Sequence, residues 1–212
     1  QDTRIPVTAG SMATVYEDGL ADGVQHGVDS ETATGSFTVN ANGETYVLTL
    51  NGAAITAVGD SVDTGKGVLT ITAISAPVGG VVTYDYSYTL SAAQTHAGQG
   101  EVNPLSDTIA IAVSDATGDA SAPASIVISI VDDVPVAADN ANAVTEGLGN
   151  HADGNVFAND TIGADGAAAG GAVVGARSGD ESGAGAYGSV TAAGVTISGT
   201  YGDLLIKSDG SY

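Results

Sequence analysis

TYDYSYTL, residues 83–90, is the clearest strand in this chain. Its three tyrosines, Tyr84, Tyr86 and Tyr88, alternate with small or polar residues, so an extended backbone would place all three on one face. Such alternation with a period of two is typical of a β-strand that buries one face in a core. The tyrosine face is therefore predicted to be core, and the alternative is an exposed platform on which a sugar would stack.

The same alternation recurs on both sides of this stretch. Ile, Leu or Val occupies every second position in three further runs, around residues 69–71, 109–113 and 126–130. Clusters of Gly, Asn and Asp such as NANG at 40–43 separate the runs and are typical of turns. No segment carries the apolar stripe of an amphipathic helix. The sequence therefore predicts an all-β chain built as antiparallel β-sandwiches.

A junction, DDVPVAAD at residues 132–139, has a faint copy near the N-terminus. When Glu146 is set over Glu17, an offset of 129 (146 − 17), several residues match. The matching pairs are Pro135/Pro6, Val136/Val7, Ala138/Ala9 and Val144/Val15. Two similar segments one domain length apart predict a tandem array.

We therefore predict one β-sandwich domain over residues 1–133 and a second over residues 134–212. The second has weak strand signals until residue 190, with expected strands at 141–145, 194–198 and 203–207. Its last hairpin, within 201–212, breaks off before a full second strand. The second domain is thus expected to be incomplete at its C-terminus, and the chain is expected to be a piece of a longer array.

Composition excludes several function classes. Four Lys and Arg against 25 Asp and Glu give a net charge of −21, which argues against nucleic acid or an anionic membrane surface as partner. No run of 18 apolar residues is present, so no membrane insertion is expected. The chain has no cysteine, so a metal held by carboxylates is the available cross-link for a secreted protein.

Several longer motifs resemble repeats of the RTX adhesins of bacteria. The motifs DDVPVA (132–137), VTEG (144–147), GNVFANDT (154–161) and YGDLLIKSDGSY (201–212) resemble the VCBS-type repeat, and LSDTIAIAVSDATGD (105–119) resembles another repeat type of the same proteins. The resemblance implies immunoglobulin-like or cadherin-like sandwiches that bind calcium near domain junctions and act as extenders. It also implies export by type I secretion, a location at the bacterial cell surface, and a role in attachment and biofilm formation. The implied partners are neighbouring repeats and, through other domains, surface or matrix glycans.

Four carboxylates are predicted to converge at the N-terminal pole of the first domain. The hairpin that precedes the junction would place Asp115 and Asp119 there, and Glu17 and Asp18 lie at the start of the domain. Converging carboxylates repel one another unless a cation intervenes, and calcium accepts six to eight oxygen ligands. A plain Asp-Gly turn at 115–119 is the alternative.

A second acidic group is predicted at the junction itself. Asp132, Asp133, Asp139 and Glu146 flank the proline-containing linker. We expect Ca²⁺ to bind these side chains, bridge the two domains and fix the angle between them.

The remaining candidates are weaker. Asp160 and Asp165 are either a loop site for a cation or solvated loop residues, and His26, His96 and His151 are predicted to be solvated loop histidines because none has metal-ligand spacing. No catalytic motif is present, so no enzyme is predicted. The hypothesis is a calcium-stiffened extender of a secreted adhesin, and the alternative is a module that binds a glycan or protein through the tyrosine face or loops.

Overall fold

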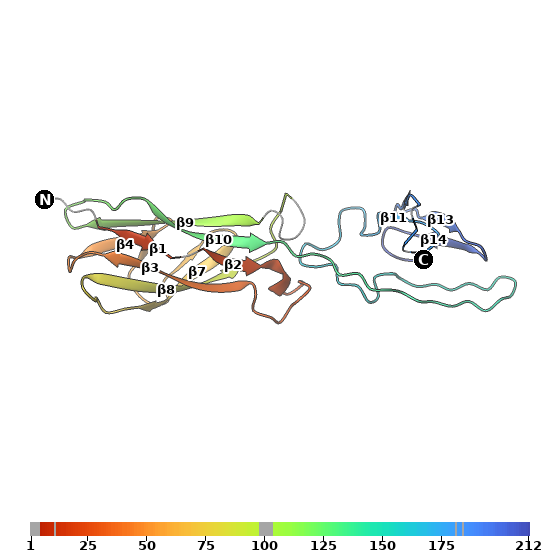
Figure 1. Ribbon diagram of the computed structural model, residues 1–212, viewed down its shortest axis with the longest axis horizontal. Helices are drawn as coiled ribbons and strands as arrows, with labels where there is room; N and C mark the ends of the chain where they lie inside the picture. Colours follow the sequence, from red (N-terminus) through yellow and green to blue (C-terminus); the bar gives the residue numbers. More distant parts are fainter. Residues whose placement is uncertain (1–4, 11, 98–103, 181, 184) are drawn as a thin grey trace. The chain divides into compact units, whose positions relative to one another are not determined.

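The computed structural model describes residues 5–10, 12–97, 104–180, 182–183 and 185–212. The chain divides into two compact units, Gln1–Val134 and Pro135–Tyr212, each of which is described by itself. The boundary lies one residue after the predicted one. Both units are built of β-strands, most of which are labelled in Figure 1.

The first unit consists of two five-stranded sheets with turn-rich connections. One sheet contains, in spatial order, β1 (Val7–Ala9), β3 (Thr32–Asn40), β8 (Val81–Leu90), β7 (Gly67–Ile74) and β6 (Ser61–Asp63). The other contains β2 (Ala13–Tyr16), β10 (Ala124–Val131), β9 (Leu105–Asp115), β4 (Tyr46–Leu50) and β5 (Ala53–Ile55). All strand pairs are antiparallel except β2 with β10.

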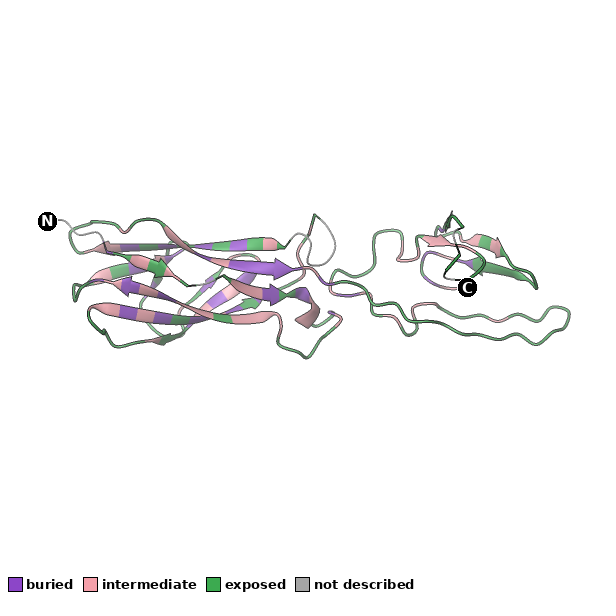
Figure 2. Cartoon of the chain, viewed as in Figure 1, coloured by how far each residue is buried: buried purple, intermediate pink, exposed green. Residues whose placement is uncertain are grey.

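One apolar core joins the inner faces of the two sheets. In β8 the alternation of the sequence becomes alternation of burial, and Tyr84, Tyr86 and Tyr88 are 6%, 1% and 0% exposed. Figure 2 shows the same alternation along the long strands of both sheets. The tyrosine face is therefore core, as predicted, and cannot serve as a platform for sugar. The ring of Tyr86 also requires Gly35 on the neighbouring strand, because a Cβ at that position would lie 2.4 Å from the tyrosine hydroxyl.

The parallel pairing of β2 with β10 differs from the predicted all-antiparallel arrangement. Tyr16, the last residue of β2, lies opposite Val131, the last residue of β10. Both strands therefore run toward the same pole of the first unit, which we call the C-terminal pole. Alternation of side chains is identical in parallel and antiparallel strands, so the sequence pattern did not distinguish the two.

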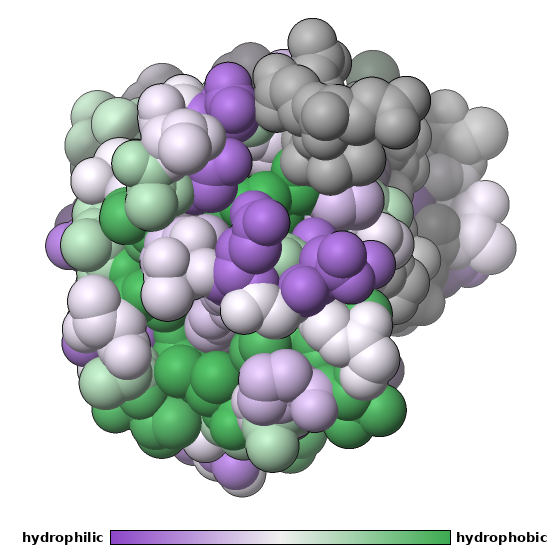
Figure 3. Space-filling model, turned by 90° about the vertical axis from the view of Figure 1, so that its left-hand side faces the viewer, coloured by the Kyte–Doolittle hydropathy of each residue, from purple (hydrophilic) through white to green (hydrophobic). Residues whose placement is uncertain are grey.

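The opposite, N-terminal pole carries the turns that join β3 to β4, β7 to β8 and β9 to β10. It faces the viewer in Figure 3, where apolar and hydrophilic surface lie side by side. In the turn between β7 and β8, Val78 is 77% exposed.

The second unit contains two small sheets. They are formed by β11 (Gly175–Ala176) with β12 (Gly188–Ser189), and by β13 (Val195–Ser198) with β14 (Asp203–Ile206). The strand predicted at 141–145 is absent, because residues 141–145 form no ladder, whereas the strands predicted near 194–198 and 203–207 are present. Among the described residues of this unit, only Val190 and Ile206 are buried apolar side chains, and most of the unit is exposed in Figure 2.

Segments of the second unit are held mainly by polar bonds. The backbones of Gly154 and Tyr212 exchange two hydrogen bonds of 3.0 Å, and Asn142 Nδ2 donates to the Tyr212 hydroxyl at 2.9 Å. No helix in the described parts of either unit has the length and hydrophobicity that crossing a membrane requires.

Candidate metal centre

Two carboxylates meet at the C-terminal pole because β2 and β10 are parallel neighbours. Glu17 directly follows Tyr16, and Asp132 directly follows the paired Val131. His96, in the loop after β8, completes the group. Ligand atoms of Glu17, His96 and Asp132 all lie within 4.8 Å of one another. We call these three residues the pole cluster.

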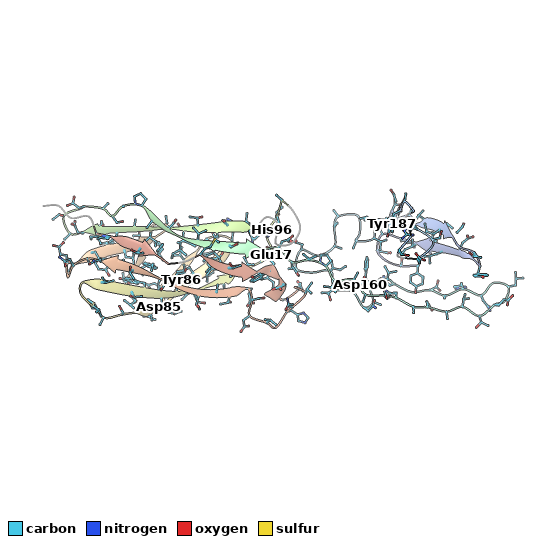
Figure 4. All side chains as sticks on the ribbon, in the orientation of Figure 1. Glu17, Asp85, Tyr86, His96, Asp160 and Tyr187 are labelled. Carbon is cyan, nitrogen blue, oxygen red and sulfur yellow. The ribbon has the colours of Figure 1, made fainter. Side chains whose placement is uncertain are left out.

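Glu17 is the most buried member of the pole cluster. Its carboxylate is 0% exposed, and its Oε1 accepts hydrogen bonds from the backbone N–H of Gln94 at 2.7 Å and lies 3.0 Å from His96 Nε2. Figure 4 shows Glu17 and His96 next to each other at this pole. A buried carboxylate is stable only when charge or hydrogen bonds compensate for its lost hydration. The loop after β8 thus supplies this compensation from both its backbone and its imidazole.

The predicted grouping of Glu17 and Asp18 with Asp115 and Asp119 is wrong. Asp115 pairs with Tyr46 at the start of β4, at the N-terminal pole, whereas β2 ends at the C-terminal pole. The error arose because Glu17 was placed from its position early in the chain. A strand early in a domain can still end at the pole opposite to the one where the chain enters the domain.

His96 was predicted to be a solvated loop histidine, and that prediction is wrong. Its side chain is 2% exposed. The other two histidines are at the surface: His26 lies in an exposed turn, and the side chain of His151 is 76% exposed beside Asp153. His96 lies 79 residues after Glu17, so no local spacing in the sequence indicates their contact.

Asp18 and Asp133, also at this pole, have positioning roles. Asp18 accepts bonds from the Ser30 hydroxyl at 2.6 Å and from Gln25 Nε2 at 2.7 Å. Asp133 accepts the backbone N–H groups of Val24 and Val134, both at 2.9 Å. These bonds fix the loop that follows β2 against the end of β10.

The backbone of this loop is wound tightly beside the pole cluster. A short 3₁₀ turn, η1 (Glu17–Gly19), follows β2, and the N–H of Gln25 returns to the carbonyl of Asp18 at 2.9 Å. Gly23 is required here, because a Cβ on it would lie 2.2 Å from the carbonyl oxygen of Asp18. A Cβ on Gly19 would lie 2.6 Å from Glu31 Oε2, so a further carboxylate, absent from the sequence prediction, lies against η1.

A hollow in the surface adjoins the pole cluster. It has a volume of about 340 Å³, and its lining includes Asp18, Asp132 and Asp133 together with Tyr16 and Val131. Three carboxylates thus border the hollow, and one of them, Asp132, is shared with the pole cluster.

At the N-terminal pole, the side chain of Asp115 accepts hydrogen bonds within its own turn. Its Oδ1 accepts the N–H and hydroxyl of Thr117, both at 2.8 Å, and the N–H of Asp119 at 3.0 Å. The Thr117 hydroxyl and then the Asp119 N–H hold the pKa of Asp115 below its ordinary value. The exposed Asp119 accepts a bond from the same hydroxyl at 3.1 Å. This geometry is that of the plain turn, the alternative that the sequence left open.

The acidic group predicted at the junction is divided between the two units. Asp132 and Asp133 belong to the first, whereas Asp139 and Glu146 belong to the second and are exposed. Within the second unit, Asp160 Oδ1 accepts the N–H of Ala138 at 2.8 Å, so it holds two segments together. Asp165 lies exposed in a loop.

No protein-family model matches this chain, and the searches of curated proteins and of solved structures returned no match either.

Proposed function

We propose that this chain is an extender segment of a large bacterial surface adhesin, exported by type I secretion, whose first unit is stabilised by a divalent cation at the C-terminal pole. The adhesin assignment rests on the motifs of residues 105–119 and 132–161 and on the closing motif of the second unit. The cation assignment rests on one observation: the carboxylate of Glu17 is fully buried beside Asp132 and His96. Calcium is the ion that the abundance of oxygen ligands favours.

The energetic need for a cation follows from the spacing of the two carboxylates. Oxygens of the two carboxylates lie within 4.8 Å of each other, and two charges at this limit repel by about 3 kcal/mol at an effective dielectric constant of roughly 20. A divalent ion held by Glu17 and Asp132 would offset this repulsion. It would also reinforce the pairing of the end of β2 with the end of β10.

The position of the site along the chain explains how an ion would serve an extender. Two residues after Asp132 comes Val134-Pro135, where the second unit begins and where proline fixes one backbone angle. A bound ion would hold the strand end from which this linker starts. Calcium sites of extracellular modules have dissociation constants of about 10⁻⁴–10⁻³ M, so the site would be empty in the cytosol and filled outside the cell.

Thermal unfolding of the 212-residue chain in excess EDTA, in calcium and in magnesium tests this proposal. At a calcium concentration ten times the dissociation constant, the midpoint of the first unit should rise by roughly 5 °C. Glu17→Gln should abolish the shift, because the amide retains the size of the side chain and loses its charge. Asp22→Asn is the matched control, since Asp22 is an exposed carboxylate of the same loop. A wild-type chain that unfolds identically in EDTA and calcium would disprove the cation site.

A further inference from the structure

One member of the pole cluster does not suit calcium. Calcium is a hard cation that takes oxygen ligands, whereas an imidazole nitrogen is a preferred ligand of zinc and related first-row ions. His96 contributes such a nitrogen at 3.0 Å from Glu17 Oε1, beside a second carboxylate from Asp132. One nitrogen and two carboxylate donors are a ligand set of borderline transition ions.

The burial of His96 argues that this nitrogen is built into the site. Only 2% of its side chain is exposed, against 76% for the surface residue His151. The ring nitrogen that faces Glu17 is Nε2. The other ring nitrogen, Nδ1, is buried and has no hydrogen-bond partner among the described residues, so the site does not supply His96 with the outer hydrogen bond that would fix its tautomer. A buried imidazole loses its hydration, and the loss is compensated when a ring nitrogen binds a metal ion.

The backbone around the cluster holds the donors in place. The pairing of Tyr16 with Val131 fixes the backbone positions of the next residues, Glu17 and Asp132. The N–H of Gln94 orients the Glu17 carboxylate. Outer hydrogen bonds of this kind orient ligands in metal sites and raise affinity. Donor atoms of a tetrahedral ion with bonds of about 2.0–2.1 Å lie roughly 3.3 Å apart. The 3.0 Å between His96 Nε2 and Glu17 Oε1 is close to this value, and all three residues have donor atoms within 4.8 Å of one another.

We infer that the pole cluster is a site for a first-row transition ion of the Zn²⁺ class, with Glu17, His96 and Asp132 as its protein ligands. The inference rests on the proposed cation site and names the ion that binds there most tightly. With three protein ligands, such an ion would take water as a further ligand, and Asp132 is the member of the cluster that borders the hollow. The nearby carboxylates of Asp18 and Asp133 add attraction for a cation of either class.

The test compares zinc and calcium binding by titration calorimetry on the 212-residue chain and on two histidine variants. His96→Gln should weaken zinc binding by about 100-fold or more, beyond the 10–100-fold that loss of an outer partner typically costs. The same variant should change calcium binding by less than about threefold, since calcium gains little from the imidazole. His26→Gln, the matched control, removes an exposed histidine of the same pole and should change neither affinity.

Nuclear magnetic resonance of the imidazole nitrogens gives a second readout that does not depend on the folding of a variant. The chain has three histidines and no cysteine, so each ring can be followed in the unmodified protein. Stoichiometric zinc should shift the nitrogen signals of His96 alone. Zinc that binds as tightly to His96→Gln as to the wild type, or that leaves the His96 signals in place, would overturn the inference.

The two proposals fail in different ways. Calcium binding that Glu17→Gln abolishes, together with zinc binding no tighter than calcium, would overturn the transition-ion site and leave the cation-stabilised extender intact. Absence of binding by both ions would overturn both.

Discussion

The hydroxyl of Tyr88 donates a hydrogen bond of 2.7 Å to the buried carboxylate of Asp107, and this bond joins the two sheets of the first unit. Tyr88 lies on β8 in one sheet and Asp107 on β9 in the other, and the two side chains are 0% and 4% exposed. The hydroxyl of Thr64 donates to the same carboxylate oxygen. The buried Asp107 side chain is thus satisfied by a hydroxyl from a strand of the opposite sheet and by one from the turn between β6 and β7.

Replacing Tyr88 by Phe should lower the free energy of unfolding by about 1.5–3 kcal/mol, because it removes a hydrogen bond to a buried charged group. A double-mutant cycle with Asp107→Asn, measured by urea denaturation, should give a coupling energy of at least about 0.5 kcal/mol. Tyr86→Phe is the control, since the Tyr86 hydroxyl lies over Gly35 rather than beside a carboxylate. Strictly additive effects of the two substitutions would show that the bond contributes nothing to stability.

Stability of the first unit should fall at alkaline pH. Burial raises the pKa of both Tyr84 and Tyr88 well above the usual value of about 10. A hydrogen bond with Tyr46 raises the pKa of Tyr84 further, and the hydrogen bond to Asp107 does the same for Tyr88. The folded chain therefore keeps these protons above pH 10, while the unfolded chain releases them. The contribution is fully present below about pH 10 and is lost as the pH rises further.

Urea denaturation at a series of pH values, with tyrosinate absorbance of the folded chain as a parallel measurement, checks this expectation. Tyr84→Phe and Tyr88→Phe should each make the decline above about pH 10 shallower. A free energy of unfolding that stays constant through this range would contradict the raised pKa values.

Asp115→Asn should leave the response to calcium unchanged. The carboxylate already accepts three bonds from its own turn, and an amide oxygen can accept the backbone N–H groups in its place. Because the pKa of Asp115 is lowered in the folded state, its own contribution to stability is present at neutral pH and lost in acid, as pH falls through the folded pKa. Loss of the calcium-dependent shift in melting temperature in this variant, with retention in Glu17→Gln, would place the ion at the N-terminal pole instead.

Amide hydrogen exchange should be slower in the first unit than in the second. β8 and β10 are central strands over a continuous core, whereas β13 and β14 form a two-stranded sheet in a unit whose described residues bury only Val190 and Ile206. Opening free energies follow buried apolar contacts, so β13 and β14 should exchange first. Equal protection of β8 and β14, read by mass spectrometry, would contradict this expectation.

The strands could be predicted because their signal is local. In β8 and β9 nearly every second side chain is buried, and the sequence shows this alternation within ten and eleven residues. In β10 the alternating Ile126, Ile128 and Ile130 are buried, and so are Ser129 and Val131 at its end. The second unit was predicted less well, because its segments carry small side chains and are held by polar bonds such as that from Asn142 to Tyr212. These bonds leave no periodic pattern.

The site could be predicted only in part, because its members come from three distant segments. Glu17 and Asp132 were both proposed as metal ligands from the sequence, but at different poles. Their proximity depends on the parallel direction of β2, which alternation does not encode. His96 lies in the loop that begins after Leu90, the last residue of β8, whose N–H donates to the carbonyl of Glu31. The position of His96 therefore depends on the course of this loop. Asp115 was proposed as a metal ligand but lies in a plain turn. Acidic turns and calcium loops use the same residue types, so the local sequence does not distinguish the two.

The direction of β2 also determines how the first unit bears tension. Its chain enters β2 from the N-terminal pole and leaves β10 at the C-terminal pole, and the two strands lie side by side from Ala13 with Ile128 to Tyr16 with Val131. Tension on the two ends of the unit would act on β1, which pairs with β3, and on the parallel pair of β2 and β10 along the strand direction. The hydrogen bonds of the parallel pair would then be loaded together rather than broken one at a time. We therefore expect a sandwich with this strand arrangement to resist stretching along its length.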